Sequence, residues 1–63
     1  MNKYYAYKPT DDGKEPMGTM TKMLFELKTD AGAIRRAFRN YGQTARVFRF
    51  TNFYDDSTFR RVI

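Results

Sequence analysis

The 63-residue sequence contains no cysteine and no histidine, and its only serine is Ser57. Without cysteine or histidine the chain can form no disulfide, no Cys/His zinc site, no cysteine nucleophile and no histidine-based catalytic triad. No apolar run reaches the ~18 residues needed to span a bilayer, and the N-terminus lacks the apolar core of a signal peptide. We therefore expect one small soluble domain, residues 1–63, located in the cytoplasm and without a membrane partner.

The remaining residues offer no catalytic or metal-binding set. Asp11-Asp12 and Asp55-Asp56 lie beside turn signals, and adjacent residues in a strand would point to opposite faces. The four glycines are too dispersed for a phosphate-binding loop, and Ser57 has no histidine or suitably placed lysine as a base. We therefore predict that the protein is not an enzyme and that it has no catalytic residues, no metal and no cofactor.

The positive charge is concentrated in the second half of the sequence. Residues 1–33 balance five lysines against five acidic residues, whereas residues 34–63 carry seven arginines against Asp55 and Asp56. The whole formal net charge of +5 therefore comes from the second half. Guanidinium groups pair with two oxygens at once and stack on rings. This excess favours a polyanionic partner, either nucleic acid or an acidic protein surface; the alternative is a solvated face that only improves solubility.

Hydrophobic patterning predicts the element order β-β-α-β-β. Four segments have strand-like composition or alternation: residues 2–8, 19–28, 45–53 and 58–63. Between the first two strands, residues 9–18 contain two prolines and two glycines and are predicted to form a mobile polar loop. We therefore expect an α+β fold in which antiparallel hairpins form a three- to four-stranded sheet, covered on one face by a single helix.

The helix is predicted to span about residues 30–41. Either Thr29 or Asp30 can cap its first amide groups, and Gly42 suits a left-handed C-terminal residue. Its apolar stripe follows the spacing i, i+3, i+4 and i+7: Ile34, Ala37, Phe38 and Tyr41. A single helix of this length leaves the other face of the sheet uncovered.

Side-chain alternation along each strand predicts which residues lie under the helix. The expected core is Tyr5, Met23, Phe25, Leu27, Ile34, Phe38, Tyr41, Phe48, Phe50, Phe59 and Ile63. The expected uncovered face is Tyr4, Lys22, Leu24, Val47, Arg49, Thr51, Arg60 and Val62. Such a mixture is typical of RNA-binding sheets, of protein interfaces and of homodimer interfaces. Residues 46–50 do not match the RNA-recognition-motif signature, because they lack its glycine and its small residue.

The sequence thus predicts a small basic binding module whose favoured partner is nucleic acid. The candidate binding residues are Arg35, Arg36 and Arg39 on the helix, Arg49 and Arg60 on the sheet, and Tyr4 for base stacking. The helix cluster is favoured over the sheet arginines because its charges are contiguous and the helix contains no glutamate. Arg46 and Arg61 share their alternation with core positions, and the strand arginines are expected to shield strand edges or to reach over the core with their apolar stems.

A second class of function remains open. A stand-alone inhibitor or adaptor, of the type carried by phages and mobile elements, would bind and occlude a host or defence protein. An arginine-rich surface would suit the acidic groove of a nucleic-acid enzyme or other nucleic-acid-binding protein. The chain could also form a homodimer through its uncovered sheet face, which would bury more apolar surface than a domain of this size can bury alone.

Overall fold

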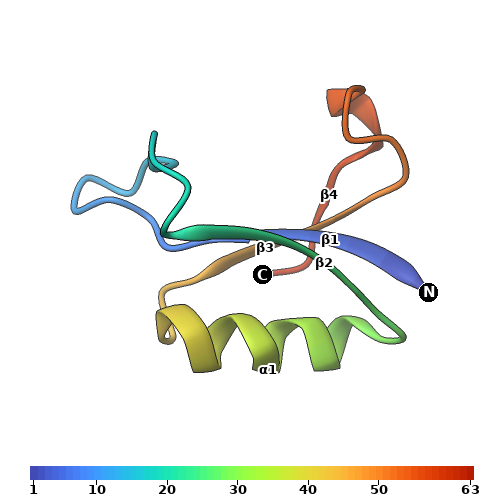
Figure 1. Cartoon of the computed structure of the whole chain (residues 1–63), viewed down its shortest axis with the longest axis horizontal. Helices are drawn as coiled ribbons and strands as arrows, with labels where there is room; N and C mark the ends of the chain where they lie inside the picture. Colours follow the sequence, from blue (N-terminus) through green and yellow to red (C-terminus); the bar gives the residue numbers. More distant parts are fainter.

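A computed structural model describes residues 1–63 as a four-stranded antiparallel sheet with one helix packed on one face (Figure 1). The elements are β1 (Asn2–Tyr7), β2 (Lys22–Leu27), helix α1 (Asp30–Tyr41), β3 (Arg46–Phe50), the 3-10 helix η1 (Asp56–Thr58) and β4 (Arg60–Arg61). The strand order is β2-β1-β3-β4, so β1 and β3 pair with each other and join two hairpins side by side. The predicted α+β fold and its element order are therefore confirmed. Helix α1 is neither long enough nor apolar enough to cross a membrane.

Helix α1 begins and ends where the sequence predicts. The Thr29 hydroxyl oxygen accepts a hydrogen bond from the Gly32 amide at 3.1 Å, so Thr29 is the N-cap. At the other end Gly42 has a φ of +84° and donates its amide to the Phe38 carbonyl at 2.8 Å. Glycine adopts this positive φ without the steric cost that a Cβ would add.

The predicted assignment of faces is correct for β2 and wrong for β1, β3 and β4. Met23, Phe25 and Leu27 of β2 do pack under α1. In the register, however, Tyr4 pairs with Phe25 and with Arg49, so the fully buried Tyr4 shares the helix-covered face. Val47 and Val62 pack in this same core, not on the uncovered face. Tyr5, Phe48 and Phe59, predicted as core, lie half-buried on the opposite face, and Ile63 is exposed at the chain end. Phe50 is buried as predicted, but on this opposite face, where it stacks on Phe59.

Small side chains explain which face receives the helix. Ala33 and Ala37 are the fully buried positions of α1, and they pack in one cluster with Ala6 and Ala45 of the sheet region. Alanine at these contacts lets the helix backbone approach the sheet closely, and the larger side chains of this interface pack around the alanines. Tyr4 therefore provides the largest fully buried side chain, with its ring stacked on Phe25 at a centroid distance of 5.6 Å; the remaining core residues flank it: Met23, Leu27, Ile34, Phe38, Tyr41 and Val62.

The bulky rings gather on the opposite face. Phe50 stacks on Phe59 at a centroid distance of 4.9 Å, and Phe53 contacts both rings. Figure 1 shows that residues 8–21 and residues 51–59 both rise from the sheet on the side away from α1. The fourth strand is shorter than predicted because η1 occupies the turn at Asp56–Thr58, although backbone bonds from Val47 still hold the C-terminus to the sheet.

We expect the domain to unfold at alkaline pH. Burial is the main cause that raises the pKa values of Tyr4, Tyr5 and Tyr41 above the ordinary value of 10. Above pH 10 the unfolded chain therefore releases tyrosine protons that the folded chain retains, so stability falls as pH rises, by up to about 1.4 kcal/mol per pH unit for each such group. Urea titrations at pH 8 and at rising pH above 10 should show a falling midpoint, and a Tyr41→Phe variant should show a shallower fall.

Candidate functional site

The helix arginines occupy two different environments. Arg35 and Arg39 lie on the side of α1 opposite the buried Ala33 and Ala37, and neither makes a hydrogen bond or an ion pair within the chain. The Arg36 guanidinium lies over the Phe25 ring, 4.9 Å from its centroid, in a cation–π contact at the margin of the sheet. Arg35 and Arg39 are therefore free for a partner, whereas Arg36 also stabilises the fold.

Arg49 and Arg60 lie on the helix-covered face, not on the uncovered face where the sequence analysis places them. Arg49 is directly opposite Tyr4 in β1 and opposite Arg60 in β4, so all three share one face. The alternation of β3 is fixed by Val47, which is buried against the helix. Arg49 forms an ion pair with Asp30 at 3.4 Å, while Arg60 is exposed and has no such partner.

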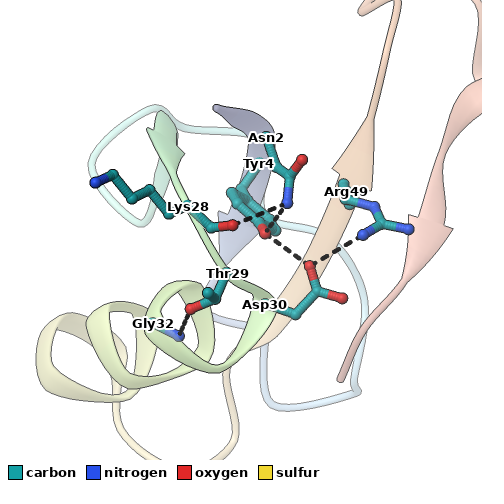
Figure 2. A network of polar contacts seen from close by, with 7 residues as sticks. All are labelled: Asn2, Tyr4, Lys28, Thr29, Asp30, Gly32 and Arg49. Atoms are coloured by element: carbon teal, nitrogen blue, oxygen red, sulfur yellow. Dashed lines mark hydrogen bonds and ion pairs between the residues drawn. The ribbon is translucent and has the colours of Figure 1, made fainter.

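Tyr4 is fully buried and cannot stack on a nucleic-acid base, so that prediction is wrong. Its hydroxyl donates to the Asp30 carboxylate at 2.6 Å and accepts from the Asn2 side-chain amide at 3.1 Å (Figure 2). Burial raises the pKa of Tyr4, and the hydrogen bond to Asp30 raises it further because ionisation would remove the donor. Tyr4 is thus a structural residue.

The contacts of Asp30 fix the start of α1 against the two central strands. Its carboxylate receives the Tyr4 hydroxyl from β1 and the Arg49 guanidinium from β3, and Thr29 beside it caps the helix (Figure 2). A negative charge in the first turn also interacts favourably with the helix dipole. These contacts set the orientation of α1, and with it the direction of Arg35 and Arg39.

The fold separates the charges into a strongly basic side and a neutral side. We define the helix side as α1, the β2–α1 connection and the strand residues that face α1. It carries six basic residues and one acidic residue, Asp30, which leaves a charge of +5: Lys28, Arg35, Arg36, Arg39, Arg49 and Arg60. The groove side, which comprises the other strand face with residues 8–21 and 51–59, balances six basic against six acidic residues. The whole net charge of the protein therefore lies on the helix side.

A polar hollow lies where β3 and β4 meet the segment that connects them. It has a volume of about 520 Å³, and Arg49 and Arg60 line it together with Asn2 and the hydroxyl residues Thr51, Ser57 and Thr58. Two guanidinium groups directly opposite each other in neighbouring strands repel, and only Arg49 is paired with a carboxylate. This hollow can receive an anion that bridges the two arginines.

The aromatic residues of the groove side are not among the binding residues predicted from the sequence. Tyr5, Tyr7 and Phe48 are half-buried on the uncovered face, and Arg46 and Arg61 share that face. A signal was present in Ala6 and Ala45, because small residues in line with Tyr4 and Val47 match the alanines of the helix.

No group of three or more carboxylates converges as a potential metal site.

Comparisons with known proteins give no relative on which function could be based: no protein-family model, no curated protein and no solved structure matches the chain.

Proposed function

We propose that the protein is a binding module that holds the phosphate backbone of a nucleic acid on its helix side. The observation that carries this proposal is the charge separation, since the full net charge of +5 lies on one side of the sheet. A surface with one sign of charge attracts a polyanion and orients it during encounter.

Arginine is suited to this role because its planar fork pairs two phosphate oxygens at once. Arg35, Arg39 and Arg60 are exposed and make no hydrogen bond or ion pair within the chain, so they can bind phosphate without breaking an internal contact. The hollow lined by Arg49 and Arg60 offers a place for one phosphate group. Together these residues provide between three and five phosphate contacts.

The helix side provides little means of reading bases. Its four aromatic rings, those of Tyr4, Phe25, Phe38 and Tyr41, are buried or half-buried between α1 and the sheet. Exposed rings would be needed to stack on bases, and contacts to base edges would be needed to read their sequence, whereas phosphate contacts carry no sequence information. We therefore expect binding that depends weakly on sequence.

A salt titration with a mixed-sequence DNA oligonucleotide tests the proposal. A protein that contacts three to five phosphates should show log K falling against log[salt] with a slope of roughly −3 to −4.5. Changing the base sequence at constant length should change the affinity only slightly. The proposal is wrong if neither DNA nor RNA binds below ~100 µM at physiological salt, the upper end of the usual non-specific range.

An acidic protein surface is the alternative partner for the same arginines, as an inhibitor or adaptor of a nucleic-acid enzyme would require. Both partners would compete for Arg35, Arg39 and Arg60. Nucleic acid is favoured because the free arginines spread from the helix to β4 and suit an extended charged backbone. Capture of a protein from a nuclease-treated lysate, lost on charge reversal of these arginines, together with an absent response to nucleic acid would select the alternative.

A further inference from the structure

The groove side contains a hollow that the proposed nucleic-acid surface does not use. It lies between residues 8–21 and residues 51–59 and has a volume of about 500 Å³. We call it the aromatic groove, because five of its lining side chains are aromatic: Tyr5, Tyr7, Phe48, Phe53 and Phe59. It lies on the opposite side of the sheet from α1, so a ligand in it would not compete with phosphate on the helix side.

The rings of the groove are held in place but remain accessible. Tyr7 stacks on Phe48 at a centroid distance of 6.0 Å, and Tyr5 contacts the edges of Phe53 and Phe59 at 6.2 and 6.4 Å. Tyr5, Tyr7, Phe48 and Phe59 are half-buried, and 43% of Phe53 is exposed. Rings fixed by their neighbours can receive a flat or cationic group at a small cost in conformational entropy.

The charges that line the groove are predominantly negative. Glu15 and Asp56 both line it, and the only basic residue among its lining, Lys22, already donates its ammonium to the Pro16 carbonyl at 3.1 Å. Glu15 accepts the hydroxyl of Tyr5, which orients its carboxylate towards the floor of the groove. The Asp56 carboxylate makes no hydrogen bond or ion pair within the chain and is free to pair with a ligand.

We propose that the aromatic groove binds an arginine side chain of a partner protein. Aromatic faces attract a cation, and a guanidinium can stack on a ring while its fork pairs with a carboxylate such as that of Asp56. A phosphate or a nucleic-acid backbone would be repelled by Glu15 and Asp56, so the ligand chemistry of this side is opposite to that of the helix side. The protein would then join a nucleic acid on one side to a basic segment of a protein on the other.

The test uses two tripeptide probes, acetyl-Gly-Arg-Gly-amide and the same peptide with citrulline in place of arginine. Citrulline has nearly the shape of arginine but no charge. We expect the arginine peptide to shift the NMR signals of Tyr7, Phe48 and Asp56 in a saturable manner, and the citrulline peptide to bind about tenfold more weakly, because it loses the cation–π and charge-assisted contacts.

Two variants with the same change in charge show whether a carboxylate of the groove binds the peptide or whether the overall charge of the protein does. Asp56→Asn removes the free carboxylate of the groove and should lower the affinity for the arginine peptide about fivefold to tenfold. Asp11→Asn is the matched control, since Asp11 lies on the same side, makes no side-chain contact and does not line the groove. The control should bind the peptide like the unmodified protein, and neither variant should weaken DNA binding.

Four results would overturn the proposal. The first is equal binding of the arginine and citrulline peptides. The second is an equal loss of affinity for the arginine peptide in Asp56→Asn and Asp11→Asn. The third is movement of groove signals on addition of a DNA oligonucleotide, which would assign the groove to nucleic acid. The fourth is movement of the same signals with protein concentration alone, which would assign the groove to a second copy of the chain.

Discussion

Replacing Arg35, Arg39 and Arg60 together by glutamate is expected to abolish nucleic-acid binding while the fold persists. Each replacement changes the charge by two, so the helix side and the whole protein change from +5 to −1. Each lost phosphate contact should make the salt slope shallower by about one unit, so the slope should approach zero. Binding isotherms at three salt concentrations measure both effects.

The fold should tolerate these three substitutions. The side chains are exposed and make no contact that the structure would lose, and such surface changes are usually within about 0.5 kcal/mol. Glutamate has nearly the same helix propensity as arginine, and positions 35 and 39, one turn apart, carry like charges before and after the change, so their mutual repulsion stays about the same. Arg36 is left unchanged because its contact with Phe25 contributes to stability. Circular dichroism before and after heating checks this expectation.

A matched triple variant on the groove side distinguishes position from total charge. Lys3→Glu, Lys8→Glu and Arg61→Glu produce the same net charge of −1, but all three residues are exposed on or beside the other face. We expect this variant to keep most of its affinity at 150 mM salt, where charges more than ~8 Å apart are largely screened. Equal loss in both variants would contradict the proposal, because net charge alone would then account for binding.

Local signals predicted the elements of this fold well. Thr29 and Gly42 mark the two ends of the helix because capping depends only on the residue and its immediate neighbours. The period-two pattern of β2 was equally clear, since charged and apolar residues alternate there, and its apolar line faces the helix. Element order and fold class followed from these patterns.

The faces of β1 and β3 could not be predicted by ranking hydrophobicity. Both faces of each strand present apolar or aromatic side chains, so the larger rings of Tyr5, Phe48 and Phe50 suggest that their face is the core. The structure instead places Tyr4 and Val47 under the helix, because alanines in the helix and the sheet match each other in size. Complementary volume between two elements is a tertiary property, and alternation within one strand does not contain it.

Because the faces of β3 and β4 were predicted wrongly, the candidate binding residues were also divided wrongly between the two sides of the sheet. From the sequence, one surface is predicted for Arg35, Arg36 and Arg39, and a competing surface for Arg49 and Arg60. In the structure the alternation of β3 places Arg49 and Arg60 on the same side as the helix. The number of arginines was therefore readable from the sequence, whereas their convergence on one side required the register of the sheet. Whether this side binds nucleic acid stays a prediction.

Tyr4→Ala is expected to leave the protein with little or no stability near room temperature, whereas Tyr7→Ala should remain well folded. Tyr4 is fully buried, and truncating a large buried ring costs about 3–5 kcal/mol. A domain of this size has only about 5 kcal/mol of stability in total. Tyr7 lies on the uncovered face in the same strand, is half-buried and contacts the rings of Tyr5 and Phe48, so we expect its truncation to cost about 1 kcal/mol. Urea unfolding followed by circular dichroism measures both.

Tyr4→Ala and Tyr7→Ala test which face of the sheet is the core, and Tyr7→Ala also tests the binding chemistry of the groove. Tyr4→Phe keeps the buried ring and removes only the hydrogen bond to Asp30, so it should remain folded and lose about 1–2 kcal/mol. If Tyr7→Ala proves more destabilising than Tyr4→Ala, the aromatic face is the core and the helix does not cover Tyr4. If Tyr7→Ala stays folded, it should bind DNA normally and bind the arginine peptide more weakly, because its ring forms part of the groove and lies on the opposite side of the sheet from Arg35 and Arg39.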